Sequence, residues 1–170
     1  MTITVMTVAI GAVLLVAGCG SSPASSAVPP QSTQSASSSP APAALDAAGE
    51  LAKLKAAGLP IGATGVVTAA NDSNHLLGRP NGYASKVYWT DTRVDQSKLS
   101  LSSVGGTDPG GSIETYPDVA GATTRRDFLA AIAKSAPVLA NEYDYLAGTS
   151  VVRVSGLLTP EQAKSYADAA

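Results

Sequence analysis

The chain of 170 residues carries 11 basic and 13 acidic residues, and its pI is near 5.2. This near balance of charge argues against a nucleic-acid-binding protein, because such a protein needs a basic surface that neutralises phosphates. The single cysteine leaves no partner for an intrachain disulfide, so we expect an apolar core to stabilise the fold.

The N-terminal stretch has the features of an export signal. Residues 3–16 contain no charged residue and are mostly small or aliphatic. A run of about 14 such residues matches a signal-peptide core and falls short of the ~20 residues of a membrane-spanning helix. It ends in Val-Ala-Gly-Cys at 16–19, which resembles a bacterial lipobox, although no Lys or Arg precedes the apolar run. We therefore predict a lipoprotein signal peptide over 1–18 and lipidation of Cys19; the alternative is an ordinary secretory signal followed by an unrelated cysteine.

A polar tether is predicted to follow the lipidated cysteine. Residues 20–44 are almost entirely Ser, Ala, Pro, Thr and Gln, with no charged residue. Such a segment cannot bury enough apolar surface to offset the entropy of ordering it, so we expect disorder over 19–44. Two or more acyl chains on Cys19 would hold the protein to the membrane without spanning it. A single folded domain is expected over 45–170, where all charged and aromatic residues lie.

Helix and strand signals in the predicted domain come in groups. The expected elements, in chain order, are a helix over 47–57, strands over 64–70, 85–92 and 111–116, a helix over 119–135, strands over 143–146 and 150–155, and a helix over 160–169. Asp46 and Asp118 precede the first two helices as N-caps, and the sequence at 159–162 is a capping box. Grouped strands predict an α+β domain with a largely antiparallel sheet of about four to five strands and about three helices packed on one face.

The helix over 119–135 is expected to be amphipathic. Its predicted apolar stripe consists of Phe128, Leu129, Ile132 and Ala133. Its predicted water-facing residues are Arg125, Arg126, Asp127 and Lys134. Between the second and third strands, residues 93–110 are polar and rich in glycine, which indicates a long loop with at most one short edge strand.

No catalytic or metal-binding constellation emerges from the sequence. His75 is the only histidine, and no second His or Cys stands at ligand spacing from it. No Gly-x-Ser-x-Gly segment supplies a nucleophile. Glu114, Glu142 and Asp144 are candidates for a glycosidase carboxylate pair, but on strand faces we expect them to be solvated. We likewise expect Arg153 on an exposed strand face. No catalytic residue, metal or cofactor is therefore predicted.

The loop over 71–83 is the candidate binding segment. Pro80 restricts its own φ and biases Arg79 toward extended backbone, which preorganises the loop and lowers the cost of ordering it on binding. Arg and Tyr are also enriched among binding hot spots. The candidate binding residues are Asn74, His75, Arg79 and Tyr83, with Trp89 of the adjoining strand as support. The alternative is that Leu76 and Leu77 fill the core while the turn only reverses the chain.

Several stretches carry a family resemblance. They are the lipobox, the Ser/Pro tether, Asn-His-Leu-Leu-Gly-Arg-Pro at 74–80, Gly-Gly-Ser-Ile-Glu-Thr-Tyr at 110–116 and Val-Arg-Val-Ser-Gly-Leu-Leu-Thr-Pro-Glu-Gln-Ala at 152–163. These stretches resemble small secreted lipoproteins of actinobacteria and of some of their phages, and the resemblance covers nearly all of residues 10–170. It implies an extracytoplasmic, lipid-anchored protein and contributes no catalytic residue.

An anchor, a tether and one small domain without a catalytic constellation fit a binding protein. We expect a non-catalytic binding or interaction module on the outer face of the cell membrane, with an envelope protein or a cell-wall component as its partner. The resemblance to proteins carried by phages keeps a prophage-encoded superinfection-exclusion lipoprotein as an alternative. An envelope hydrolase is the third reading.

Overall fold

The computed structural model describes residues 46–95, 97, 99, 104–137 and 141–170, which belong to one compact unit. The predicted signal peptide, the lipidated Cys19 and the tether over 19–44 lie outside the described residues. The elements are α1 (Ala47–Ala56), β1 (Ile61–Val66), β2 (Ser85–Asp91), β3 (Gly110–Thr115), α2 (Val119–Ser135), β4 (Glu142–Ala147), β5 (Ser150–Ser155) and α3 (Pro160–Ala169).

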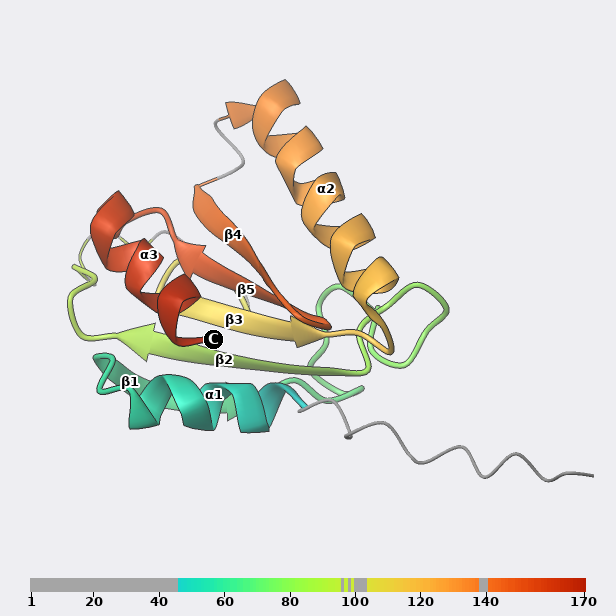
Figure 1. Ribbon diagram of the computed structural model, residues 1–170, viewed down its shortest axis with the longest axis horizontal. Helices are drawn as coiled ribbons and strands as arrows, with labels where there is room; N and C mark the ends of the chain where they lie inside the picture. The colour runs from blue at the N-terminus through green and yellow to red at the C-terminus, as the bar shows by residue number, and fades with distance from the viewer. Residues whose placement is uncertain (1–45, 96, 98, 100–103, 138–140) are drawn as a thin grey trace, which may run out of the picture. The chain divides into compact units, whose positions relative to one another are not determined.

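The five strands form one sheet in the order β1-β2-β3-β5-β4, and all neighbours pair antiparallel (Figure 1). The predicted α+β class, the antiparallel sheet and the three helices are confirmed for the described part of the chain. The sheet order places β3, which comes third in sequence, at the centre, with β2 on one side and β5 on the other.

Side-chain caps define where the helices begin, as predicted. Asp46 accepts a hydrogen bond from the Gly49 N–H at 2.8 Å, and Asp118 accepts one from the Gly121 N–H at 2.8 Å. At α3 both hydrogen bonds of the capping box between Thr159 and Gln162 are present. These caps satisfy backbone donors that a helix leaves unpaired at its start.

The first strand lies earlier in the chain than predicted. β1 begins at Ile61 and ends at Val66, whereas the strand was expected over 64–70. The residues after β1 form a turn instead, because Asn71 accepts a hydrogen bond from the Thr68 N–H at 2.6 Å and donates its own N–H to the Thr68 carbonyl at 3.1 Å. In the 93–110 segment, the described residues before Gly110 contain no strand.

The helices are divided between the two faces of the sheet rather than gathered on one. The helices α1 and α3 cover an apolar face, and Figure 1 shows α2 set apart from them. The buried apolar-face residues are Ala47, Leu51 and Leu54 of α1, Val87, Trp89, Ile113, Val152 and Val154 of the strands, and Ala163 and Tyr166 of α3. On the other face, Leu129 of α2 packs with Val151 of β5 and Tyr116.

Strand alternation explains this division. Successive residues of a strand point to opposite faces, so Val151 and Val152 support different cores. The face that carries Val151 also carries charged residues of β2, β3 and β5, and α2 supplies an arginine to them. The helix α2 covers that face and pairs its Arg125 with Glu114 of β3.

Candidate functional site

A buried group of charged side chains lies between the sheet and α2. Its centre is Glu114 of β3, whose side chain is 0% exposed. The carboxylate accepts hydrogen bonds from Lys86 Nζ of β2 at 3.0 Å, from Arg153 Nη1 of β5 at 2.7 Å and from Arg125 Nε of α2 at 2.8 Å. Four elements thus meet at one carboxylate.

The sheet register brings these residues together. Lys86 stands directly opposite Glu114 in the β2–β3 pair. Arg153 stands opposite Ser112, two residues from Glu114 on the same face, and so reaches Glu114 diagonally. On its other side Arg153 stands opposite Asp144 of β4. The register therefore explains why residues far apart in the sequence share one site.

A second part of the group lies at β4. Arg153 Nη2 donates hydrogen bonds to both carboxylate oxygens of Glu142, at 2.6 and 2.8 Å, and Arg153 Nε lies 3.6 Å from Asp144 Oδ1. Glu142 also accepts a hydrogen bond from Thr107 at 2.8 Å. We call the set Lys86, Glu114, Arg125, Glu142, Asp144 and Arg153 the Glu114 network.

The protonation of the Glu114 network follows from burial and from its charges. Burial alone would raise the pKa of Glu114, but Arg153, Lys86 and Arg125 together hold that pKa well below its ordinary range. Burial lowers the pKa of Lys86, and the attraction of Glu114 offsets only part of that effect. At Asp144, burial and then the repulsion of Glu142 raise the pKa to about 7.

Several expectations from the sequence are therefore wrong at these positions. Arg153 and Arg125 were expected to face water, but each side chain is only 13% exposed. Glu114, Glu142 and Asp144 were expected to be solvated and are largely enclosed. The physical reason is that each charge has a partner on a neighbouring strand or on α2, which allows burial that an isolated charge would resist.

The candidate binding loop is built around Asp72. Its Oδ2 accepts the N–H groups of Leu76 and Leu77, both at 2.8 Å, and its Oδ1 accepts the Tyr83 hydroxyl. Burial, reinforced by the Asp72 carboxylate, raises the pKa of Tyr83, so the phenol stays protonated as the donor. The loop is a locally closed structure with an internal carboxylate.

The five candidate binding residues do not form one exposed site in the structure. Asn74, His75 and Arg79 are exposed, whereas Tyr83 is fully buried and packs edge-on against Tyr116. Tyr83 is therefore not a ligand contact, and that expectation is corrected by its bond to Asp72. Trp89 lies on the opposite face of the sheet and packs against Tyr166, with ring centroids 5.3 Å apart. It cannot support the loop directly.

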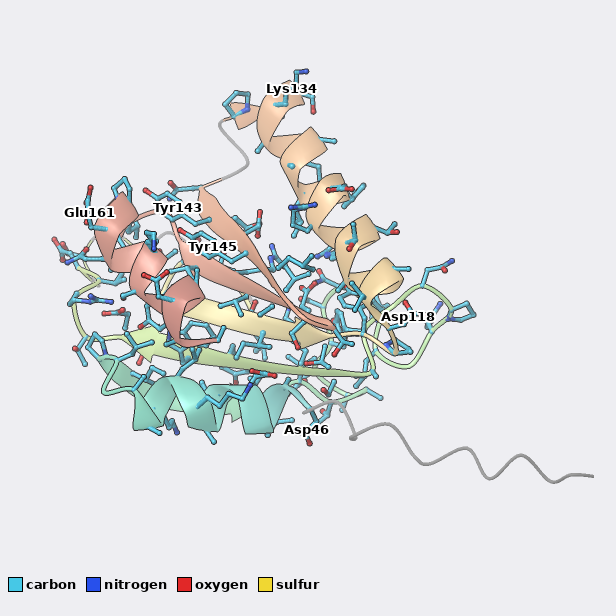
Figure 2. All side chains as sticks on the ribbon, in the orientation of Figure 1. Asp46, Asp118, Lys134, Tyr143, Tyr145 and Glu161 are labelled. Carbon is cyan, nitrogen blue, oxygen red and sulfur yellow. The ribbon has the colours of Figure 1, made fainter. Side chains whose placement is uncertain are left out.

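A groove lies between the exposed part of this loop and the first half of α2. Its volume is about 630 Å³. Figure 2 labels Asp118 at the start of α2, beside the loop. The lining residues are Leu76, Arg79, Pro80, Asn81 and Gly82 of the loop, Tyr116, Pro117 and Asp118 of the connection, and Ala120, Gly121, Thr124, Arg125 and Phe128 of α2. Arg79, a candidate binding residue from the sequence, thus lines the groove. The other wall of the groove is formed by α2, which the sequence did not indicate as part of a site.

The groove combines apolar surface with guanidinium groups. Phe128 is 55% exposed, so its assignment to the buried stripe of α2 is wrong, whereas Leu129 of the same predicted stripe is buried in the core. The Arg125 guanidinium lies 5.7 Å from the Phe128 ring centroid. The guanidinium of Arg79 makes no hydrogen bond or ion pair within the described part of the chain, and only the Arg79 backbone is bonded, to Leu76 and Gly82. Small residues on α2, such as Ala120 and Gly121, leave the groove open.

Two further findings concern the described residues alone. Within them, no cluster of three or more His, Cys, Asp or Glu side chains is arranged to hold a metal ion. None of their helices is both long enough and apolar enough to cross a membrane.

Comparison with known proteins found no match to a protein-family model, to a curated protein or to a solved structure.

Proposed function

We propose that this chain is a membrane-anchored envelope lipoprotein whose folded domain is a non-catalytic binding module. The groove between the 76–82 loop and α2 is its binding site. The observation that carries this proposal is the groove itself, with a volume of about 630 Å³ and with the exposed side chains of Phe128 and Arg79 in its lining. Pockets of roughly 300–1,000 Å³ with apolar walls and a few polar groups are typical of ligand sites.

Both walls of the groove are held by buried polar contacts. Asp72 fixes the loop through two backbone N–H groups and the Tyr83 hydroxyl. Arg125 ties α2 to the sheet through Glu114. A site whose walls are already ordered loses less conformational entropy when a ligand binds, which favours affinity.

The charges near the groove favour binding over chemistry. Glu114, the carboxylate behind Arg125, is fully buried and shared among three cations, so it is held ionised and does not contact a ligand. Asp118 uses its carboxylate to cap α2. Neither Asp118 in the groove lining nor Glu114 behind it is thus placed as a general acid or base.

Filling the groove should abolish ligand retention. Thr124 is exposed and lines the groove, so Thr124→Trp places an indole in the ligand's space while keeping the buried contacts. Full-length protein in biotinylated phosphatidylcholine nanodiscs is incubated with an envelope extract, and bound peptides and small molecules are identified by mass spectrometry. We expect compounds retained by wild type to fall at least about tenfold in the variant, in line with the loss of a well-packed contact.

A matched control separates the groove from a general effect of added tryptophan. Ala131 is exposed on the same helix but does not line the groove, so Ala131→Trp should retain the wild-type set of compounds. If wild type and Thr124→Trp retain the same compounds, the groove is not the binding site and the proposed function fails.

The proposed membrane address depends on Cys19. In an actinobacterial host, Cys19→Ala should abolish the lipid modification, and the intact mass should show the loss of the acyl groups. Each buried CH₂ contributes about 0.8 kcal/mol to membrane binding, so loss of two chains should weaken partition into detergent. An unmodified mass for the wild-type protein would contradict the anchor.

A further inference from the structure

Two guanidinium groups line the same groove. Arg79 comes from the loop and Arg125 from α2. Asp118 is the carboxylate in the lining, and its Oδ1 accepts the Gly121 N–H at 2.8 Å. The charged side chains of the lining therefore leave an excess of one positive charge, in a cavity whose walls are otherwise mainly apolar.

Arg125 is held in place with donor capacity to spare. Its Nε lies 2.8 Å from Glu114 Oε2 and its Nη2 lies 3.3 Å from Glu114 Oε1. Its Nη1 makes no hydrogen bond within the described part of the chain and is not among the fully buried unpaired atoms there. An arginine fixed on one edge by a buried carboxylate can present its remaining N–H groups without losing rotamer entropy again.

Arg79 supplies the second cation without a competing partner. It is exposed, and within the described residues no carboxylate binds it, so its charge is available to a ligand. The planar N–H groups of arginine match the two oxygens of a carboxylate. An excess of one positive charge fits a monoanion better than a phosphate dianion.

We propose that the groove binds an apolar ligand through a terminal carboxylate. The carboxylate lies between Arg79 and Arg125, and the apolar body packs against Leu76, Pro117 and Phe128. This inference rests on the proposed function, because it names the ligand chemistry of the same groove. Two sources carry that chemistry: the C-terminal end of a peptide with an apolar last residue, and an acyl chain with a free carboxylate.

The test compares probes that differ only in charge. Isothermal titration calorimetry on the full-length protein in phosphatidylcholine nanodiscs measures N-acetyl-Leu-Phe against its C-terminal amide, and octanoate against octanamide, with empty nanodiscs subtracted. Wild type should bind at least one carboxylate about tenfold more tightly than its amide, as expected for charge-assisted hydrogen bonds. The pair that shows the preference identifies the peptide or the acyl source.

Arg79→Gln should remove this preference, and Arg126→Gln should keep it. Both variants lose one positive charge, but Arg126 pairs with Asp127 at 2.7 Å and does not line the groove. The Arg79 side chain has no ion pair to lose within the described residues, and its backbone hydrogen bonds to Leu76 and Gly82 stay in Arg79→Gln. The melting temperature should therefore remain unchanged and show that the variant is folded. The inference is overturned if wild type binds neither carboxylate more tightly than its amide, or if Arg79→Gln keeps the preference.

These failures differ from a failure of the proposed function. One possible result is that wild type binds the amides as tightly as the acids, and that Thr124→Trp binds neither. In that case the groove is a binding site and only the carboxylate assignment is wrong. If Thr124→Trp retains every compound that wild type retains, the groove itself is not the site, and both proposals fall.

Discussion

Replacing Glu114 with glutamine is expected to lower the free energy of unfolding by about 3–5 kcal/mol, the usual cost of breaking a buried ion pair by removing one partner. The variant keeps the size of the side chain, removes its charge and replaces one accepting oxygen with an NH₂ donor. Lys86, Arg125 and Arg153 then share a buried site without their common counter-charge. Urea denaturation followed by circular dichroism measures the loss, and the melting temperature should fall by about 10–20 °C.

Glu161→Gln is the matched control. It makes the same chemical change at a fully exposed position in the first turn of α3, so little change in stability is expected. If Glu114→Gln is as stable as this control, the three cations do not depend on the Glu114 charge. The Glu114 charge would then not stabilise the Glu114 network.

The parts of the fold that sequence predicts are those set by neighbours in the chain. Asp118 caps α2 by accepting the N–H of Gly121, only three residues along the chain, and the bounds of α2 agree with the prediction at both ends. The capping box at Thr159 and Gln162 depends on residues within one turn. In β2, the alternation of Val87 and Trp89 with Tyr88 marks one buried face, as expected from the two-residue period of a strand.

The Glu114 network could not be predicted because its partners are distant in sequence. Arg153 is 39 residues from Glu114, and Arg125 comes from a helix rather than a strand. Only the strand order and register show that these charges face one another. A usable signal existed nonetheless: Arg153 is the single charged residue of β5 and stands between the apolar residues Val152 and Val154.

The candidate site was predicted in part. The loop and Arg79 do line the groove, because Pro80 and its neighbours form an exposed turn. Tyr83 was misplaced because its hydroxyl binds Asp72 inside the same loop, a contact that composition does not reveal. The α2 wall was missed as well, because the sequence placed both Phe128 and Leu129 in the apolar stripe, and only Leu129 is buried.

Asp144→Asn is expected to make the domain more stable than wild type at pH 8 and to lose much of that advantage at pH 5. Burial and the nearby Glu142 raise the pKa of Asp144 from 3.8 to about 7 in the folded protein. A carboxyl group with a raised folded-state pKa contributes stability that is fully present below its unfolded-state pKa. That contribution is lost as the pH rises through about 7.

The size of the effect follows from the slope of about 1.4 kcal/mol per pH unit between the two pKa values. Between pH 5 and pH 8 the free energy of unfolding of the wild type should therefore fall by on the order of 3 kcal/mol relative to that of Asp144→Asn. Urea denaturation at both pH values measures this difference. The other charged groups facing Asp144 are Glu142, Arg153, Glu114 and Arg125. They are the same in both proteins, so their effects largely cancel in this difference.

Asp127→Asn provides the control for this prediction, because its side chain is 63% exposed and lies outside the Glu114 network. It should keep the wild-type dependence of stability on pH. The opposite result would contradict the prediction. If Asp144→Asn were less stable than wild type, and if this deficit were larger at pH 8 than at pH 5, Arg153 would be stabilising the ionised Asp144 carboxylate. Arg153 would then hold three carboxylates at once, rather than being committed to Glu114 and Glu142 as its hydrogen bonds indicate.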